Sequence, residues 1–332
     1  MSTVNGLSKA GNAFDYLFEN KEEPRNVFSD RDIRPDRDIR PLNEEVKGKF
    51  STFISKAVEI ATFIPRIVFS IFFDLLLIPF GGVIALVAKC GVNYNPKENK
   101  IKKGITPILL LHGAKSNEGK FIVGRQFLKK EQFGSVFSVN YDGLCSNDPR
   151  MGIEDYANGD KIRGMIQHIK EITGSDKLIL IGHSMGGLIA SYYAEHLAKK
   201  DEISVEHVIT IASPWQGAPM IDRGWKLGGQ FSKDKESKSL QQMSRSGGTR
   251  NDPHFRQSLS GQAKQSDEEK AIKYYNIWST VDCAVPGTSG TLTQNPNRQR
   301  KFTYLGHLGI HVWPSVWRQV QLWLNEVYEV TA

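Results

Sequence analysis

The chain has 332 residues, of which 39% are apolar, so it can bury a large core and still carry a segment outside it. Its formal net charge of +7 favours anionic surfaces such as phospholipid headgroups, but no dense basic block interleaved with aromatics indicates a nucleic-acid partner. The 3 cysteines are widely spaced and include no C-x-x-C pair, which argues against a disulfide framework and a zinc site.

Residues 1–48 are polar and charged and contain a short tandem repeat, Arg31–Pro35 followed by Arg37–Pro41. Alternating charges with proline do not build a core, so we expect a flexible leader. A charged stretch followed by an apolar h-region does not open the chain, so we expect no Sec signal peptide. This predicts a cytoplasmic or peripherally membrane-associated protein and leaves export by a signal-less route open.

Residues 49–98 form a different segment, which is intensely apolar from 50 to 90. Charged residues interrupt it, so no simple spanning helix of about 18 uncharged residues fits. Its polar residues recur every three or four positions and form one narrow helical stripe: Thr52, Ser55, Glu59, Thr62, Arg66, Ser70 and Asp74. Such a helix suits a bilayer surface, packing against the rest of the protein, or, less well because of the charges, a bitopic span.

From residue 99 to 332 the pattern alternates between strands and helices, which predicts a mostly parallel sheet with crossover helices. The expected strands cover 108–111, 135–141, 178–181, 207–212, 274–279 and 302–305, and the expected helices include 155–172, the segment after Ser184, and 313–328. Residues 215–270 are rich in Gly, Ser, Lys and Gln, which predicts a polar insertion or lid.

The stretch Leu178–Gly187 reads LILIGHSMGG and turns from a buried strand into a helix at Ser184. A strained turn needs small neighbours, which Gly182 and Gly186 supply, and it exposes the serine hydroxyl above a helix N-terminus. This predicts that Ser184 is a nucleophile. The N–H of Met185, directly after it, is then one donor for a developing oxyanion.

A serine nucleophile needs a base, and a histidine base needs a carboxylate that fixes its tautomer. His307 directly follows the last expected strand and lies in a glycine-flanked loop, with His311 as the weaker alternative. Asp282 follows the strand 274–279 and is the preferred acid over Asp222 and Asp252 in the insertion.

Three features occur together: the stretch GHSMGG, the HG turn at His112–Gly113, and the downstream Asp and His. In this combination the chain resembles the α/β-hydrolase superfamily, and bacterial triacylglycerol lipases and related serine esterases in particular. The resemblance covers about 105–327 and implies the order Ser184, Asp282, His307, since the family carries similar D-x-x-V-P and GHLGI stretches. It also implies a second oxyanion donor at the N–H of Ala114 and substrate contacts at His112 and Gly113.

Two positions depart from the resembled lipases. Trp215 stands where these usually carry histidine, so we expect either an apolar wall of the acyl site or a core residue. Many secreted bacterial lipases hold calcium through an Asp after the base, but no Asp follows Asp282 here, so we expect no metal and no other cofactor.

The expected function is a serine carboxylic-ester hydrolase of lipase or phospholipase type that acts on lipid esters, with a membrane surface contacted through residues 50–90. An acyltransferase or thioesterase could use the same three residues, and a catalytically idle membrane-binding scaffold is the alternative outside enzymes. The sequence gives no indication of acyl-chain length, headgroup or oligomeric state.

Overall fold

Short runs of apolar residues form a parallel sheet at the centre of the fold. In the computed structural model, which describes residues 65–75, 95–130, 132–141, 148–226, 237–293 and 295–331, six strands pair in the order β2-β1-β3-β4-β5-β6, and every pairing is parallel. The strands are β1 (Ile108–Leu111), β2 (Val136–Val139), β3 (Lys177–His183), β4 (Ser204–Ile211), β5 (Lys273–Ser279) and β6 (Gln299–Phe302). The predicted mostly parallel α/β fold is confirmed.

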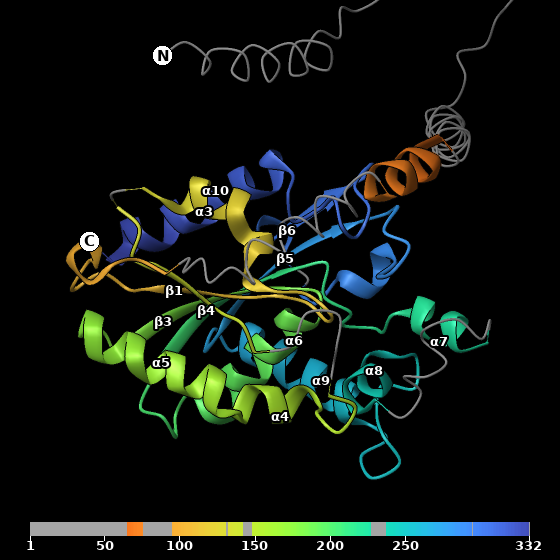
Figure 1. Ribbon diagram of the computed structural model, residues 1–332, viewed down its shortest axis with the longest axis horizontal. Helices are drawn as coiled ribbons and strands as arrows, with labels where there is room; N and C mark the ends of the chain where they lie inside the picture. The colour runs from red at the N-terminus through yellow and green to blue at the C-terminus, as the bar shows by residue number, and fades with distance from the viewer. Residues whose placement is uncertain are drawn as a thin grey trace, which may run out of the picture. The chain divides into compact units, whose positions relative to one another are not determined.

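Helices cover both faces of this sheet (Figure 1). One face packs against α3 (Ile122–Leu128) and α10 (Pro314–Thr331), and its core contains Ile108, Leu110 and Trp317. The other face packs against α4 (Ile153–Asn158), α5 (Asp160–Thr173), α6 (Met185–Tyr192) and α9 (Phe255–Glu268), with Leu109 and Leu111 in its core. Alternate residues of β1 thus enter opposite cores, as the pleat of a strand buried on both faces requires.

Several element boundaries differ from the sequence expectation; β4, for example, begins at Ser204 rather than at 207. The helix expected over 155–172 is two helices, α4 and α5, because Gly159 adopts an extended conformation between them with φ −70° and ψ 150°. After α6 the chain continues as a π-helical turn at Tyr193–Leu197. The last strand is 299–302 rather than 302–305; its exposed Arg300 and Lys301 lie on an edge strand, so apolar patterning did not reveal them.

The region 215–270 contains helices α7 (Pro219–Lys226), α8 (Lys238–Met243) and α9. Helix α9 contributes to the same core as Leu109 and Leu111, through Phe255, Leu259 and Ala263. It is therefore the crossover helix that leads into β5. The lid remains a prediction for the rest of this region.

Residues 65–75 form a helix that precedes the first strand in the chain, drawn in orange in Figure 1. They contact the loops that follow β5 and β6, through Ser70 and Asp74 respectively. Within the described part of the chain, no helix has the length and apolar character needed to cross a bilayer. The predicted leader 1–48, and residues 49–64 and 76–94 of the predicted apolar segment, lie outside the described residues.

Candidate active site

The predicted site residues follow the carboxyl ends of strands, and the parallel sheet brings these ends to one edge. His112 follows β1, Ser184 follows β3, Asp282 follows β5 and His307 follows β6. Loops at this edge are the usual location of ligand sites in open α/β sheets, because the chain is free there to vary without disturbing the core.

Ser184 lies on a strained turn between β3 and α6. Its φ of 56° and ψ of −125° are outside the conformations that side chains normally favour. A Cβ at Gly182 would overlap the backbone of Gly186, and a Cβ at Gly186 would overlap the carbonyl oxygens of Leu111 and His112. The glycines around Ser184 are therefore required by the close approach of strand, helix and the β1 loop.

Ser184, His307 and Asp282 form a continuous chain of hydrogen bonds. His307 Nε2 lies 3.0 Å from Ser184 Oγ, and its Nδ1 lies 2.8 Å from Asp282 Oδ2. A carboxylate only accepts, so Nδ1 carries the hydrogen and leaves the Nε2 lone pair of the neutral ring for the serine hydroxyl. The arrangement can move a proton from Ser184 to His307.

The Asp282 carboxylate is held by its own loop. Its Oδ1 accepts hydrogen bonds from the N–H groups of Ala284, at 2.9 Å, and Val285, at 2.8 Å. Its side chain is completely buried, whereas that of His307 is 18% exposed. The acid is thus fixed inside the fold and the imidazole reaches the surface at which a substrate would arrive.

His311, the alternative base, lies in a different place. It is buried, its ring lies tilted against that of His183 with centroids 4.6 Å apart, and its carbonyl accepts the indole N–H of Trp317 at 2.7 Å. His183 Nε2 donates to the carbonyl of His307 at 3.2 Å. Asp222 accepts instead from the N–H of Arg245, at 3.2 Å. The backbone N–H of Asp252 donates to Thr249 Oγ1 at 3.2 Å.

Burial keeps the neighbouring histidines neutral. It lowers the pKa of both His183 and His311 well below the usual value and lowers the pKa of His112 to about 4. Burial also lowers the pKa of Lys120 to about 8, with the charge of Asp74 opposing this shift. The neutral histidines around His307 do not repel the positive charge that the relay would place on it.

The loop after β1 passes directly beside Ser184. A Cβ at Gly113 would lie 2.9 Å from the Cβ of Ser184, and the next residue, Ala114, is half-buried. The His112 ring stacks on Tyr141 with centroids 4.1 Å apart, and its Nδ1 lies 2.8 Å from the Gly113 carbonyl oxygen. His112 thus supports the loop from within, while Met185 begins α6 on the other side of Ser184.

Trp215 is a core residue. Its side chain has no exposed surface, its indole N–H donates to Thr210 Oγ1 at 3.3 Å, and its ring meets Tyr274 edge to face at 5.9 Å. This packing accounts for the tryptophan as a core residue.

The contacts of Ser70 and Asp74 with the loops that follow β5 and β6 were not apparent from the sequence. Ser70 Oγ donates to the carbonyl of Val281, and Asp74 Oδ1 accepts from the N–H of Gly309. The available signal was their spacing, since two polar residues four positions apart in an apolar segment lie on one helix face.

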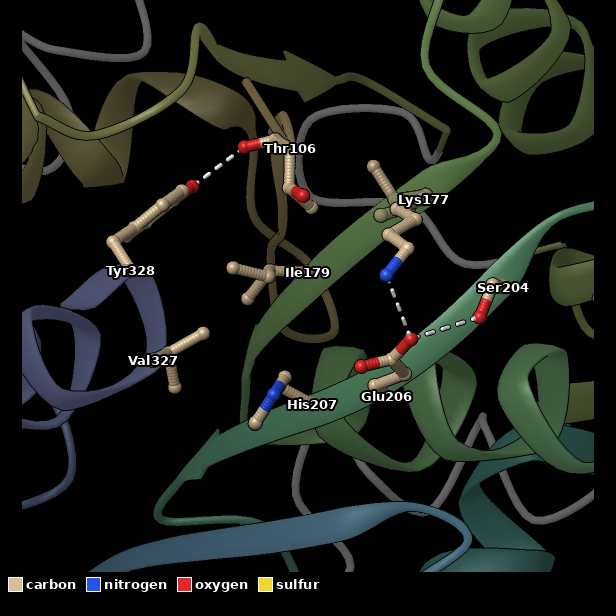
Figure 2. A pocket seen from close by; sticks show the side chains of 9 residues that line it. Thr106, Lys177, Ile179, Ser204, Glu206, His207, Val327 and Tyr328 are labelled. Carbon is tan, nitrogen blue, oxygen red and sulfur yellow. Dashed lines mark hydrogen bonds and ion pairs between the residues drawn. The ribbon is translucent and has the colours of Figure 1, made fainter. Parts of the chain in front are cut away.

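A small cavity lies at the opposite edge of the sheet (Figure 2). Lys177, which begins β3, pairs there with Glu206 at 3.2 Å, beside His207 and Tyr328. Because Ser184 follows the other end of β3, this cavity is separate from the candidate active site. No cluster of metal-ligating side chains occurs among the residues the structure describes.

A model of the alpha/beta hydrolase fold family matches residues 106–283, which is more than half of the chain. A triacylglycerol lipase of Pseudarthrobacter phenanthrenivorans is 29% identical over 121 residues, covering 35% of this chain and 35% of the lipase. A proline iminopeptidase of Saccharolobus solfataricus is 26% identical over 104 residues, covering 31% of this chain and 33% of the peptidase. The chain therefore spans about a third of the length of these curated relatives.

Among solved structures, the mature lipase BlEst2 of Bacillus licheniformis aligns with 70% of this chain and 95% of its own. The two are 16% identical, with a TM-score of 0.48.

Proposed function

Because the chain belongs to the α/β hydrolase fold family, we propose that it is a serine carboxylic-ester hydrolase of lipase or phospholipase type. The observation that supports this most directly is the hydrogen-bonded chain from Ser184 through His307 to Asp282. A matching triacylglycerol lipase supports lipid ester hydrolysis at the level of the family.

In the proposed reaction, Ser184 Oγ attacks the ester carbonyl while His307 Nε2 takes its proton. The N–H groups of Met185 and Ala114 stabilise the resulting oxyanion, and Asp282 stabilises the imidazolium. Collapse of the tetrahedral intermediate breaks the ester bond, and the leaving alcohol receives the proton from His307. Water then attacks the acyl-enzyme with His307 again as the base, which releases the carboxylic acid and restores Ser184.

A lipid surface is the proposed partner, and the helical segment 65–75 supports it. Five of its apolar side chains are between 43% and 60% exposed: Val68, Phe69, Ile71, Phe72 and Leu75. An exposed apolar face this dense on one short helix is typical of binding at a membrane interface, where these side chains would leave water for the acyl region. The net charge of +7 adds attraction to anionic headgroups.

The catalytic proposal is tested on the full chain with a fluorophosphonate probe and a panel of substrates. We expect labelling and hydrolysis of p-nitrophenyl esters and phospholipids by the wild type, and neither by Ser184→Ala. Turnover of a prolyl arylamide but not of esters would instead favour a peptidase like the archaeal relative, and silence in every assay would favour a scaffold. Acyl transfer to glycerol or a sterol in place of release to water would indicate an acyltransferase.

The membrane proposal is tested by co-sedimentation with phosphatidylglycerol vesicles. Phe69→Ser combined with Phe72→Ser should weaken partitioning about 10-fold or more, since two half-exposed aromatic side chains each contribute on the order of 1 kcal/mol. Leu322→Ser is the matched control, because Leu322 is 57% exposed on α10. Equal partitioning of the double variant and the control would contradict the proposed docking face.

A further inference from the structure

The helical segment 65–75 has its polar edge turned toward the protein. Ser70 is completely buried, and its hydroxyl hydrogen is shared between the carbonyl of Val281 and that of Ile67 in its own helix, each at 3.1 Å. Four residues later, Asp74 Oδ1 accepts from the N–H of Gly309 at 2.8 Å. Residues four apart lie one above the other on a helix, so these two side chains form one edge that contacts two different loops.

The two contacted residues lie close in sequence to Asp282 and His307, two members of the proposed relay. Val281 directly precedes Asp282, and Gly309 is two residues after His307. The loops come from different strands, β5 and β6, and share the hydrogen bond between Asp282 and His307. A single helix edge therefore touches both backbone segments whose relative position sets that hydrogen bond.

The His307 loop is shaped to receive the helix. A Cβ at Gly306 would overlap the carboxylate of Asp74, and a Cβ at Gly309 would lie 3.1 Å from the ring of Phe73. Phe73 also meets Trp313 edge to face at 5.3 Å, just before α10. The two glycines on either side of His307 thus leave space for the helix, since a methyl group at 306 would displace the Asp74 carboxylate and one at 309 would press on the Phe73 ring.

Burial of the Asp74 carboxylate has an electrostatic cost. It raises the pKa of Asp74, and the N–H groups of Gly309 and Leu308 and the nearby His307 oppose that shift. A carboxylate of this kind adds little net stability, because desolvation offsets much of the gain from its hydrogen bonds. Its geometry suits a different purpose, since a charged acceptor holds a backbone N–H in a defined position more firmly than a neutral one.

We propose that Ser70 and Asp74 are positioning residues, and that the segment 65–75 is a clamp that fixes the Asp282 and His307 loops against each other. This inference rests on the proposed serine hydrolase function and extends it to a segment outside the matched family region, which begins at residue 106. Chemistry of this type depends on sub-ångström placement of the reacting groups, so a loosened loop reduces turnover before it reduces substrate binding.

Two substitutions of Asp74 separate positioning from packing. Asp74→Leu removes the acceptor for Gly309 N–H and keeps the branched shape of the side chain in a larger volume, and Asp74→Asn keeps an acceptor oxygen. On a soluble p-nitrophenyl ester we expect Asp74→Leu to lower kcat about 10- to 100-fold with KM changed less than about 2-fold. Asp74→Asn should recover kcat to within about 3-fold of the wild type, and Ser70→Ala should give a smaller loss of kcat of about 3- to 10-fold.

The matched control is Asn295→Leu, since Asn295 accepts the N–H of Asn297 at 3.0 Å in a loop that precedes β6 at the opposite edge of the sheet. It should lower the melting temperature without lowering kcat. Loss of kcat in proportion to lost stability across all variants would overturn the clamp, as would wild-type kcat in Asp74→Leu. If Asp74→Leu fails to fold, unchanged kcat in a folded Ser70→Ala protein overturns it.

A spectroscopic measurement keeps this test independent of turnover. The Nδ1 proton of His307, hydrogen-bonded to Asp282, should give a downfield proton NMR signal that Asp74→Leu broadens or removes and Asp74→Asn and Asn295→Leu retain. A wild type without esterase activity or fluorophosphonate labelling would refute the proposed function. The NMR signal would still test the clamp, and an unchanged signal in Asp74→Leu would overturn it.

Discussion

Replacing His112 by phenylalanine tests how strongly the fold opposes protonation of the histidines at this edge of the sheet. His112 has no exposed surface, and burial lowers its pKa to about 4 from the usual 6.5. As the pH falls, the unfolded chain therefore takes up this proton before the folded protein does. The stability that the neutral ring contributes is complete above about pH 6.5 and is lost progressively between pH 6.5 and 4.

The size of the effect follows from these two pKa values. At pH 7 the difference in proton binding changes the free energy of unfolding by only about 0.2 kcal/mol, and at pH 5 by about 2 kcal/mol. Phenylalanine does not titrate and can keep the stacking on Tyr141 that the imidazole makes at 4.1 Å. Between pH 7 and pH 5, His112→Phe should therefore lose about 2 kcal/mol less stability than the wild type.

The assay is urea denaturation followed by tryptophan fluorescence at both pH values, with His168→Gln as the control because His168 is exposed on α5. The variant is compared with itself across pH, so a constant loss of stability from the substitution does not affect the result. Should His112→Phe show the same pH dependence as the wild type and the control, the reasoning that burial keeps this ring neutral is refuted.

Three further outcomes follow from the site. Asp282→Asn should lower kcat about 10³- to 10⁴-fold in the p-nitrophenyl ester assay, because an amide no longer fixes the imidazole tautomer or stabilises its charge; a loss below 10-fold would remove Asp282 from the relay. Gly186→Ala should destabilise the protein by about 1–3 kcal/mol in urea denaturation, because its methyl group would overlap two backbone carbonyls; unchanged stability would contradict the close approach. Chelation with EGTA should leave the ester hydrolysis rate unchanged, and a loss restored by calcium would show that a metal is required.

Local sequence determined the elements that carry the candidate site. A short apolar run that ends in glycines around Ser184 predicts a buried strand followed by a tight turn. In the structure, no residue larger than glycine fits at Gly182 and Gly186 without moving the backbone. The convergence of Asp282 and His307 on one edge of the sheet could also be predicted from the sequence, because both follow strands expected to be parallel. The helix break at Gly159 and the bounds of β6 were not, because an extended glycine and an exposed edge strand depend on their neighbours.

Contacts between distant segments were decided only by the tertiary structure. Sequence placed His307 and His311 four residues apart with the same chemistry, and packing brings His307 to Ser184 while it buries His311 beside His183. The polar stripe that contains Ser70 and Asp74 predicted a helix face but not its partner. That partner is a pair of loops more than 200 residues away in the chain, and only folding brings their backbone groups within hydrogen-bonding distance of the helix.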